Sequence, residues 1–250
     1  MEIAPYTLSD EPHRLGAAQL AAARSAAKDA GVAVTGLHWL LLKPAGLSIS
    51  SRDDSVRKKT IDVMLALIDQ CAELGGRYLV HGSPQQRRVE SGDTHTAALA
   101  RAQQTFAAVA ERAEKAGVVY CIEPLSSDQT PLVNTLAEAS AMVQAIGSRS
   151  VRTMLDCSSA GLSETAPLPV LIDTWLPKGM IAHVQVNDRN RRGPGQGEQR
   201  FAPLLAALVR HGYAGDIAVE PFDYVPDGPG AAARAIGYIR GILETLESIR

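Results

Sequence analysis

The feature that most constrains the fold is a regular alternation of two kinds of segment along the whole chain. Short apolar segments rich in Val and Ile, typical of strands, alternate with longer amphipathic segments typical of helices, and Gly or Pro stands at the joints. Such alternation predicts repeated βα units and a parallel sheet. We expect strands at residues 2–5, 32–42, 77–81, 118–125, 151–156, 181–186 and 216–221.

Helices are expected between these strands, and residues 55–74 form the clearest one. An apolar stripe recurs there at intervals of three and four, formed by Ile61, Met64, Leu65, Ile68 and Cys71. This spacing predicts one buried face. Gly75 and Gly76 predict the end of the helix. The other expected helices cover residues 15–30, 94–116, 135–146, 169–176, 201–211 and 231–248.

The fold class follows from the number of units and from a missing motif. Neither GxGxxG nor GxxxxGK[ST] occurs, which disfavours a doubly wound nucleotide-binding sheet. A barrel of eight βα units typically needs about 250 residues. No change of composition marks a second domain, so we expect one domain over residues 1–250, a TIM-type (β/α) barrel of seven βα units that lacks the first unit. The open edges would then be covered by a unit ahead of Met1, a partner chain, the C-terminal segment or distorted strands.

Composition excludes several classes of function. The net charge is −2 and charged residues, 21% of the chain, are mixed along it, which argues against nucleic acid as a partner. No apolar run approaches the roughly 18 residues of a membrane span. The three cysteines lack CxxC spacing, which argues against a disulfide framework and a structural zinc site. We therefore expect a soluble, cytoplasmic protein.

Polar side chains end the last four predicted strands, one βα unit apart. They belong to Glu123, Asp156, Gln185 and Glu220. A charged group at the end of a buried parallel strand is costly unless it has a function, and the carboxyl ends of barrel strands form the catalytic face. The alternative is that the acids cap the helices that follow. Three carboxylates in one apolar mouth would repel each other, and a divalent cation would neutralise them.

The type of donor indicates the ion. All four side chains offer oxygen, which favours Mg²⁺ or Mn²⁺ over Zn²⁺. His183 precedes Gln185 by two residues and so points the same way from its strand. It is a rival ligand, a neighbour of the site that contacts the substrate, or a hydrogen-bonded histidine of the barrel interior, and these readings stay open.

Motifs along nearly the whole chain resemble one known family. They are GLHWLL, HGSPQQR, CIEPL, MLD, HVQVND followed by RNRRGPGQG, and GYAGDIAVEPFDY. The chain resembles the sugar phosphate isomerase/epimerase family of xylose isomerase-like barrels, which includes ketose 3-epimerases, hydroxypyruvate isomerase and inosose dehydratase. The resemblance implies one divalent ion on Glu123, Asp156, Gln185 and Glu220. Glutamine at the third place resembles the hydroxypyruvate isomerase branch, whereas ketose epimerases carry histidine there.

The resemblance also implies a reaction. Glu123 and Glu220 would be catalytic, taking and returning a proton through an enediol. The expected function is isomerisation or epimerisation of a small sugar, sugar phosphate or keto acid. Dehydration by the same family, or a non-catalytic barrel with a regulatory role, are the alternatives. An abasic-site nuclease is disfavoured, because the six histidines form no matching constellation.

Further residues are expected to contact the substrate. Ser159 and Gln129 stand where ketose epimerases carry histidine and glutamate, so those contacts are altered. Arg191 stands at the family's substrate-binding arginine, with a solvated loop arginine as the alternative. His38 and His81 end strands on the same rim, where packing alone could also explain them. Arg87 and Arg88 could hold an anionic group, but we assign them no role. The partner is a small carbohydrate or keto acid, and homo-oligomerisation stays open.

Overall fold

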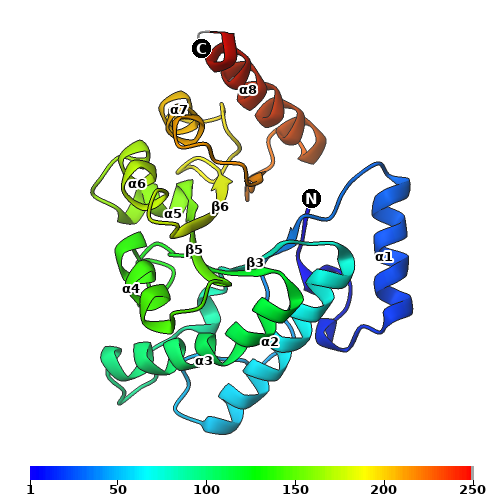
Figure 1. Ribbon diagram of the computed structural model, residues 1–250, viewed down its shortest axis with the longest axis vertical. Helices are drawn as coiled ribbons and strands as arrows, with labels where there is room; N and C mark the ends of the chain where they lie inside the picture. The colour runs from blue at the N-terminus through cyan, green and yellow to red at the C-terminus, as the bar shows by residue number, and fades with distance from the viewer. Residues whose placement is uncertain (249–250) are drawn as a thin grey trace. The chain divides into compact units, whose positions relative to one another are not determined.

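The sheet contains the parallel strands that the alternation predicts. The computed structural model describes residues 1–248 (Figure 1). Within these residues seven strands follow one another in sheet order, each beside the next: β1 (Glu2–Ile3), β2 (Gly36–Leu37), β3 (Tyr78–His81), β4 (Val119–Ile122), β5 (Val151–Asp156), β6 (Ile181–Val186) and β7 (Ile217–Val219). This is the strand order of a TIM-type α/β barrel, so the predicted fold class and the seven strands are confirmed.

Helices follow the strands in the expected places. Among the described residues they are α1 (Ala17–Asp29), α2 (Asp54–Leu74), α3 (His95–Ala116), α4 (Leu136–Ile146), α5 (Cys157–Ser163), α6 (Leu168–Trp175), α7 (Ala202–Arg210) and α8 (Gly228–Ser248). Sequence analysis missed α5, because it follows β5 without any linker. Short 3-10 helices cover Pro5–Thr7, Pro12–Arg14 and Pro84–Gln86.

The chain divides into two compact units, which we describe separately. The first covers residues 1–153 and the second begins at Met154. Strand β5 starts in the first unit and ends in the second. The expectation of one domain over the whole chain stays a prediction.

Helix α2 forms where the sequence predicts the clearest helix, although its buried face differs from the predicted stripe. Met64, Ile68 and Cys71 are buried, whereas Ile61 and Leu65 are only partly so. Thr60, Val63 and Leu67 are buried instead. The buried face is wider than the predicted stripe and rotated from it. The reason is that α2 packs against both the strand that follows it, β3, and helix α3 (Figure 1).

The predicted strand at residues 32–42 is much shorter than expected. Only Gly36 and Leu37 pair with neighbouring strands. Trp39 adopts a left-handed backbone conformation, with φ of 54°, which ends the strand. Leu40 and Leu41 are nonetheless fully buried. The apolar run therefore correctly indicated burial, but not strand geometry.

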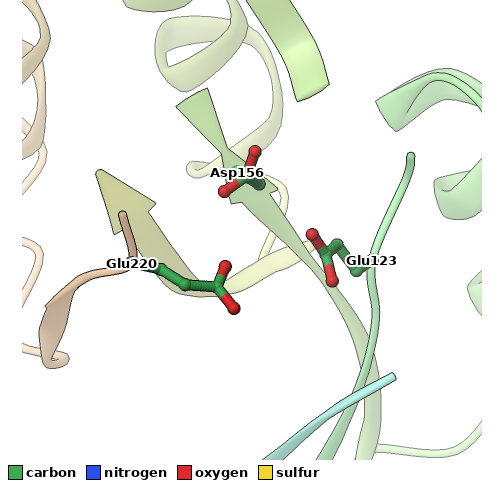
Figure 2. A group of neighbouring side chains, drawn as sticks. All are labelled: Glu123, Asp156 and Glu220. Atoms are coloured by element: carbon green, nitrogen blue, oxygen red, sulfur yellow. The ribbon is translucent and has the colours of Figure 1, made fainter. Parts of the chain in front are cut away.

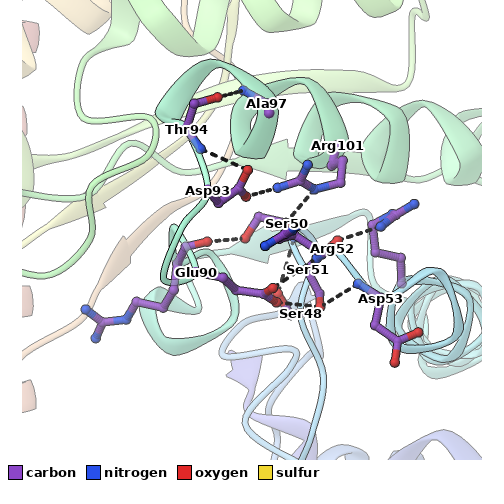
Figure 3. A network of polar contacts seen from close by, with 12 residues as sticks. Ser48, Ser50, Ser51, Arg52, Asp53, Glu90, Asp93, Thr94, Ala97 and Arg101 are labelled. Carbon is purple, nitrogen blue, oxygen red and sulfur yellow. Dashed lines mark hydrogen bonds and ion pairs between the residues drawn. The ribbon is translucent and has the colours of Figure 1, made fainter.

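A network of polar contacts joins two loops of the first unit to helix α3 (Figure 3). Ser50 Oγ donates to the carbonyl of Arg88 at 2.7 Å, and Ser51 Oγ donates to Glu90 Oε1 at 2.5 Å. Arg101 of α3 donates to the carbonyl of Ser50 at 2.9 Å and pairs with Asp93. The loops after β2 and β3 are thus held together.

A loop of the second unit is closed around one buried carboxylate. Asp188 lies two residues after β6, and its Oδ2 accepts from the amide of Gln199 at 2.8 Å. A Cβ on Gly197 would lie 2.3 Å from the Asp188 Cγ, so only glycine fits there. The loop from 188 to 199 is therefore folded back on the end of β6.

Two expectations from composition can be compared with the structure. Cys71, Cys121 and Cys157 are free and buried. None of the helices within residues 1–248 has the length and apolar character of a membrane span.

The network in Figure 3 predicts a difference between two arginines of α3. The Asp93 side chain is 7% exposed, so Arg101→Met leaves a nearly buried carboxylate unpaired. We expect the free energy of unfolding to fall by about 2 kcal/mol or more. Arg112 pairs with Asp69 at 3.4 Å with both side chains half exposed, and Arg112→Met should cost about 0.5 kcal/mol. Urea denaturation followed by circular dichroism measures the free energy of unfolding of both variants. Equal decreases in the two variants would contradict a special role for the pair of Arg101 and Asp93.

Candidate functional site

The strands of the second unit carry three of the four predicted oxygen donors at their carboxyl ends. Asp156 is the last residue of β5, and Gln185 is the last but one of β6. Strands β6 and β7 pair in parallel, with Gln185 beside Ala218, and Glu220 follows directly after β7. Parallel register therefore brings these side chains to the same edge of the sheet, as predicted.

Asp156 is buried, with 4% of its surface exposed, and both of its carboxylate oxygens accept hydrogen bonds. Oδ1 accepts from the amide of Ser159 at 2.7 Å, and Oδ2 accepts from Asn187 Nδ2 at 2.8 Å. Burial and then the charge of Glu220 raise its pKa to about 7, against the opposing effect of these donors. Asp156 also caps α5, so the helix-capping alternative holds for this residue without excluding a functional role.

Asn187 is the residue of the second unit that sequence analysis overlooked. It follows β6 directly and is fully buried. Its Nδ2 donates to Asp156 and to the carbonyl of Glu220, at 2.8 and 3.1 Å, and its Oδ1 accepts from the amide of Ser158 at 2.8 Å. The only signal in the sequence was a polar residue at the end of an apolar strand.

In the first unit, Glu123 follows β4 directly and is 6% exposed. Its amide donates to the carbonyl of His81 at 3.3 Å. Its carboxylate lies against Gly82, where an added Cβ would come within 1.7 Å of Glu123 Oε2. Glycine at position 82 is therefore what allows the carboxylate to occupy this place.

Arg87 supports the same residue from within the core. It is fully buried, and its Nη1 donates to the main-chain carbonyl of Glu123 at 2.8 Å. Burial lowers the pKa of the guanidinium to about 10, and the charge of Glu123 opposes that shift. Thr130 Oγ1 in turn donates to the carbonyl of Arg87 at 2.8 Å. Arg87 therefore has a structural place beside Glu123 that the sequence alone did not indicate.

Three acidic residues form one group of neighbouring carboxylates. Glu123, Asp156 and Glu220 each offer an oxygen, and these oxygens all lie within 4.8 Å of one another (Figure 2). Glu123 and Asp156 are buried, and Glu220 is half-buried. Like charges this close disfavour ionisation unless a cation compensates them, and an all-oxygen donor set suits a hard divalent ion. The residues present therefore fit such an ion, although its identity stays a prediction.

The predicted substrate residues of the second unit have different surroundings. Ser159 is buried in α5, where its amide donates to the capping residue Asp156. His183 is buried in β6, on the same face of the strand as Gln185. Arg191 is exposed in the loop after β6, and its guanidinium lies 5.2 Å from the ring centre of Phe222. The role of Arg191 in substrate binding therefore stays a prediction.

The predicted substrate residues of the first unit are mostly engaged locally. Gln129 Nε2 donates to Ser126 Oγ at 2.8 Å. His38 Nδ1 lies 3.9 Å from Glu2 Oε2. His81 is fully buried, with Nδ1 2.8 Å from the Tyr120 hydroxyl and the ring edge-on to Phe106. His81 therefore packs in the core beside α3, and we do not include it among the substrate residues proposed below.

Gly82→Ala tests the placement of the Glu123 carboxylate. The new methyl group would overlap Glu123 Oε2, so the carboxylate must move. Displacement of a reacting group by about 1 Å can cost on the order of 10²-fold in rate, and we expect weaker binding of Mn²⁺ as well. Calorimetric titration with Mn²⁺ measures the second effect directly. The control is Gly237→Ala on α8, because an added Cβ at position 237 would meet no other atom within 4 Å. Unchanged Mn²⁺ affinity in Gly82→Ala would contradict the placement.

The raised pKa of Asp156 predicts how pH affects the metal-free protein. The group binds its proton more tightly when folded, at a pKa of about 7, than at its ordinary value of 3.8. Its contribution to stability is therefore complete below about pH 4 and is lost as pH rises toward and through 7. Melting temperatures in EDTA between pH 5 and 8 should fall more steeply with pH for the wild type than for Asp156→Asn. A steeper fall of the melting temperature with pH for Asp156→Asn than for the wild type would contradict the raised pKa of Asp156.

Comparisons with known proteins agree with this architecture. The family model described as xylose isomerase-like TIM barrel matches residues 1–242. An L-ribulose 3-epimerase of Mesorhizobium japonicum is 29% identical over 186 residues, which cover 72% of this chain and 59% of that protein. A D-psicose 3-epimerase of Agrobacterium fabrum is 28% identical over 216 residues, 82% of this chain and 70% of that protein.

A solved structure gives the same result. The crystal structure of D-psicose 3-epimerase in the presence of D-fructose shares 25% identity at a TM-score of 0.76, covering 88% of this chain and 74% of that one. The chain thus spans 59% of the L-ribulose 3-epimerase, which is less than two thirds of its length, and 70% of the Agrobacterium fabrum enzyme. The resemblance inferred from the motifs is confirmed by the match over residues 1–242, and the chain belongs to the xylose isomerase-like TIM barrel family.

Proposed function

We propose that this protein is a sugar isomerase or epimerase that depends on a divalent cation, Mn²⁺ or Mg²⁺. The observation that carries the proposal is the group of three carboxylates at strand ends, Glu123, Asp156 and Glu220. Gln185, buried on β6, would supply the fourth oxygen. The relatives named as L-ribulose and D-psicose 3-epimerases support a sugar as the substrate.

The fit of the ion follows from the chemistry of the donors. Three carboxylates and one amide oxygen form a hard, anionic set. When bound, a divalent ion polarises the oxygens of a neighbouring carbonyl and hydroxyl, which makes the C–H bond between them more acidic.

Glu123 and Glu220 would then transfer the proton. Glu123 is held over Gly82 with Arg87 donating to its main chain, so its carboxylate has a defined position. Glu220 is half-buried and follows β7. One glutamate removes a proton from the carbon next to the carbonyl, which gives an enediol, and the other returns a proton to the opposite face or the neighbouring carbon. General acid and base catalysis of this kind contributes about 10²- to 10⁴-fold.

We propose a small free ketose as the first candidate substrate. Both named relatives act, by their names, on the third carbon of a ketose. Ser159 and Gln129 replace the ionisable groups expected at their places, and Gln129 is hydrogen bonded to Ser126. Contacts to the far hydroxyls of the sugar should therefore rely on neutral groups.

A small keto acid is the second candidate. Gln185, in place of the histidine of ketose epimerases, is the observation that favours it, because the sequence resembles the hydroxypyruvate isomerase branch at this position. Exposed Arg191 could then pair with the acid group.

Exchange of substrate hydrogen for deuterium tests the proposal. In D₂O with Mn²⁺, NMR should show deuterium entering the carbon next to the carbonyl of a ketose or of hydroxypyruvate. Glu123→Gln and Glu220→Gln should each lower the exchange rate at least about 10²-fold, because an amide can still offer oxygen but cannot take a proton. Glu111→Gln, an exposed change on α3, is the control. Full exchange in both site variants would refute the two-glutamate mechanism, and absence of Mn²⁺ binding by the wild type would favour a non-catalytic role.

A further inference from the structure

The side chain of Asn187 is connected in an unusual way for a residue without an assigned role. It is fully buried and follows β6 directly. An asparagine side chain has two N–H donors and one acceptor oxygen. Here both the nitrogen and the oxygen are engaged, the nitrogen twice. A buried amide with all of these groups satisfied is rigidly oriented.

Its partners lie at the ends of the two strands on either side of β6. On one side Nδ2 donates to Asp156 Oδ2 at the end of β5, and Oδ1 accepts from the amide of Ser158 in the first turn of α5. On the other side Nδ2 donates to the carbonyl of Glu220, 3.1 Å away. Because Val186 pairs with Val219, the residues that follow them, Asn187 and Glu220, are also neighbours. One side chain thus ties three strand ends together.

The contact with Asp156 defines the orientation of that carboxylate. Each oxygen accepts one N–H donor, Oδ1 from Ser159 and Oδ2 from Asn187. Each oxygen keeps a second lone pair. With one donor removed, the carboxylate could turn about its Cβ–Cγ bond, and the direction of the remaining lone pairs would no longer be defined.

We propose that Asn187 is a positioning residue that orients Asp156 and the main chain at Glu220 for the cation and for proton transfer. The inference rests on the function proposed above. Hydrogen-bond partners behind metal ligands typically change metal affinity by about 10- to 100-fold when they are removed. Asn187 is such a partner because it donates a hydrogen bond to Asp156. It also donates to the main-chain carbonyl of Glu220.

Replacement by leucine separates a donor role from a packing role. Leu has the branched shape of Asn but lacks the N–H groups and carries no charge, so it fills the space and cannot donate. If Asn187 only fills space, Asn187→Leu should leave the Mn²⁺ affinity unchanged. Asn187→Ala removes both shape and donors and provides a second variant.

The experiment compares Mn²⁺ binding by calorimetry with steady-state kinetics on the substrate found in the exchange test. We expect the Mn²⁺ dissociation constant to rise about 10- to 100-fold in both Asn187→Leu and Asn187→Ala. At saturating Mn²⁺, kcat should fall at least about 10-fold while KM changes less than about 3-fold, because orientation is lost rather than substrate contact. The matched control is Gln70→Ala, which removes another buried amide, one that donates to the carbonyl of Pro12 at 2.8 Å. It should leave Mn²⁺ affinity unchanged.

The outcomes separate this inference from the proposed function. If the wild type binds Mn²⁺ and exchanges substrate hydrogen, and both Asn187 variants bind Mn²⁺ within about 3-fold of it, the positioning role is wrong and the proposed function stands. If the wild type binds no Mn²⁺ and shows no exchange, both are wrong. Melting curves in EDTA show whether each variant is folded, and either folded variant is sufficient for the comparison.

Discussion

The burial of carboxylates at the carboxyl ends of parallel strands is the constraint on which the other features of this protein depend. Glu123 and Asp156 are almost completely enclosed, and Glu220 is half-buried. An ionised carboxylate removed from water loses several kcal/mol of solvation unless donors or cations replace the water. The chain supplies two N–H donors to the carboxylate of Asp156, and a bound cation would provide further compensation for the group.

The two compact units surround their buried carboxylates with different groups. In the second unit, main-chain and side-chain amides surround Asp156, and the donors come from Ser159 and Asn187. In the first unit, Glu123 lies over a glycine and beside a buried arginine that donates to its carbonyl. The amides hold Asp156 without adding a charge, whereas Arg87 adds a positive charge next to Glu123. In the proposed function, Asp156 only binds the ion, whereas Glu123 also exchanges a proton.

Some expectations failed because local patterns do not specify geometry. The run around Leu40 and Leu41 is buried as its composition suggests, yet it leaves the sheet after Leu37. His81 ends a strand as predicted, but alternation along β3 turns its ring toward Phe106 and Tyr120. A single residue of register decides which face a strand side chain occupies, and the sequence pattern located strand ends only to within a few residues.

The sequence by itself determined the parallel βα order, the positions of seven strands and the four oxygen donors at strand ends, because periodicity and burial cost are properties of short segments. It also determined the family, since the motifs lie in those same segments. Only the tertiary structure decided which groups support the acids. Asn187, Gly82 and Arg87 act on residues distant in sequence, through hydrogen bonds and close contacts that depend on strand register and loop path. No local pattern encodes such contacts, because they exist only once the strands have paired.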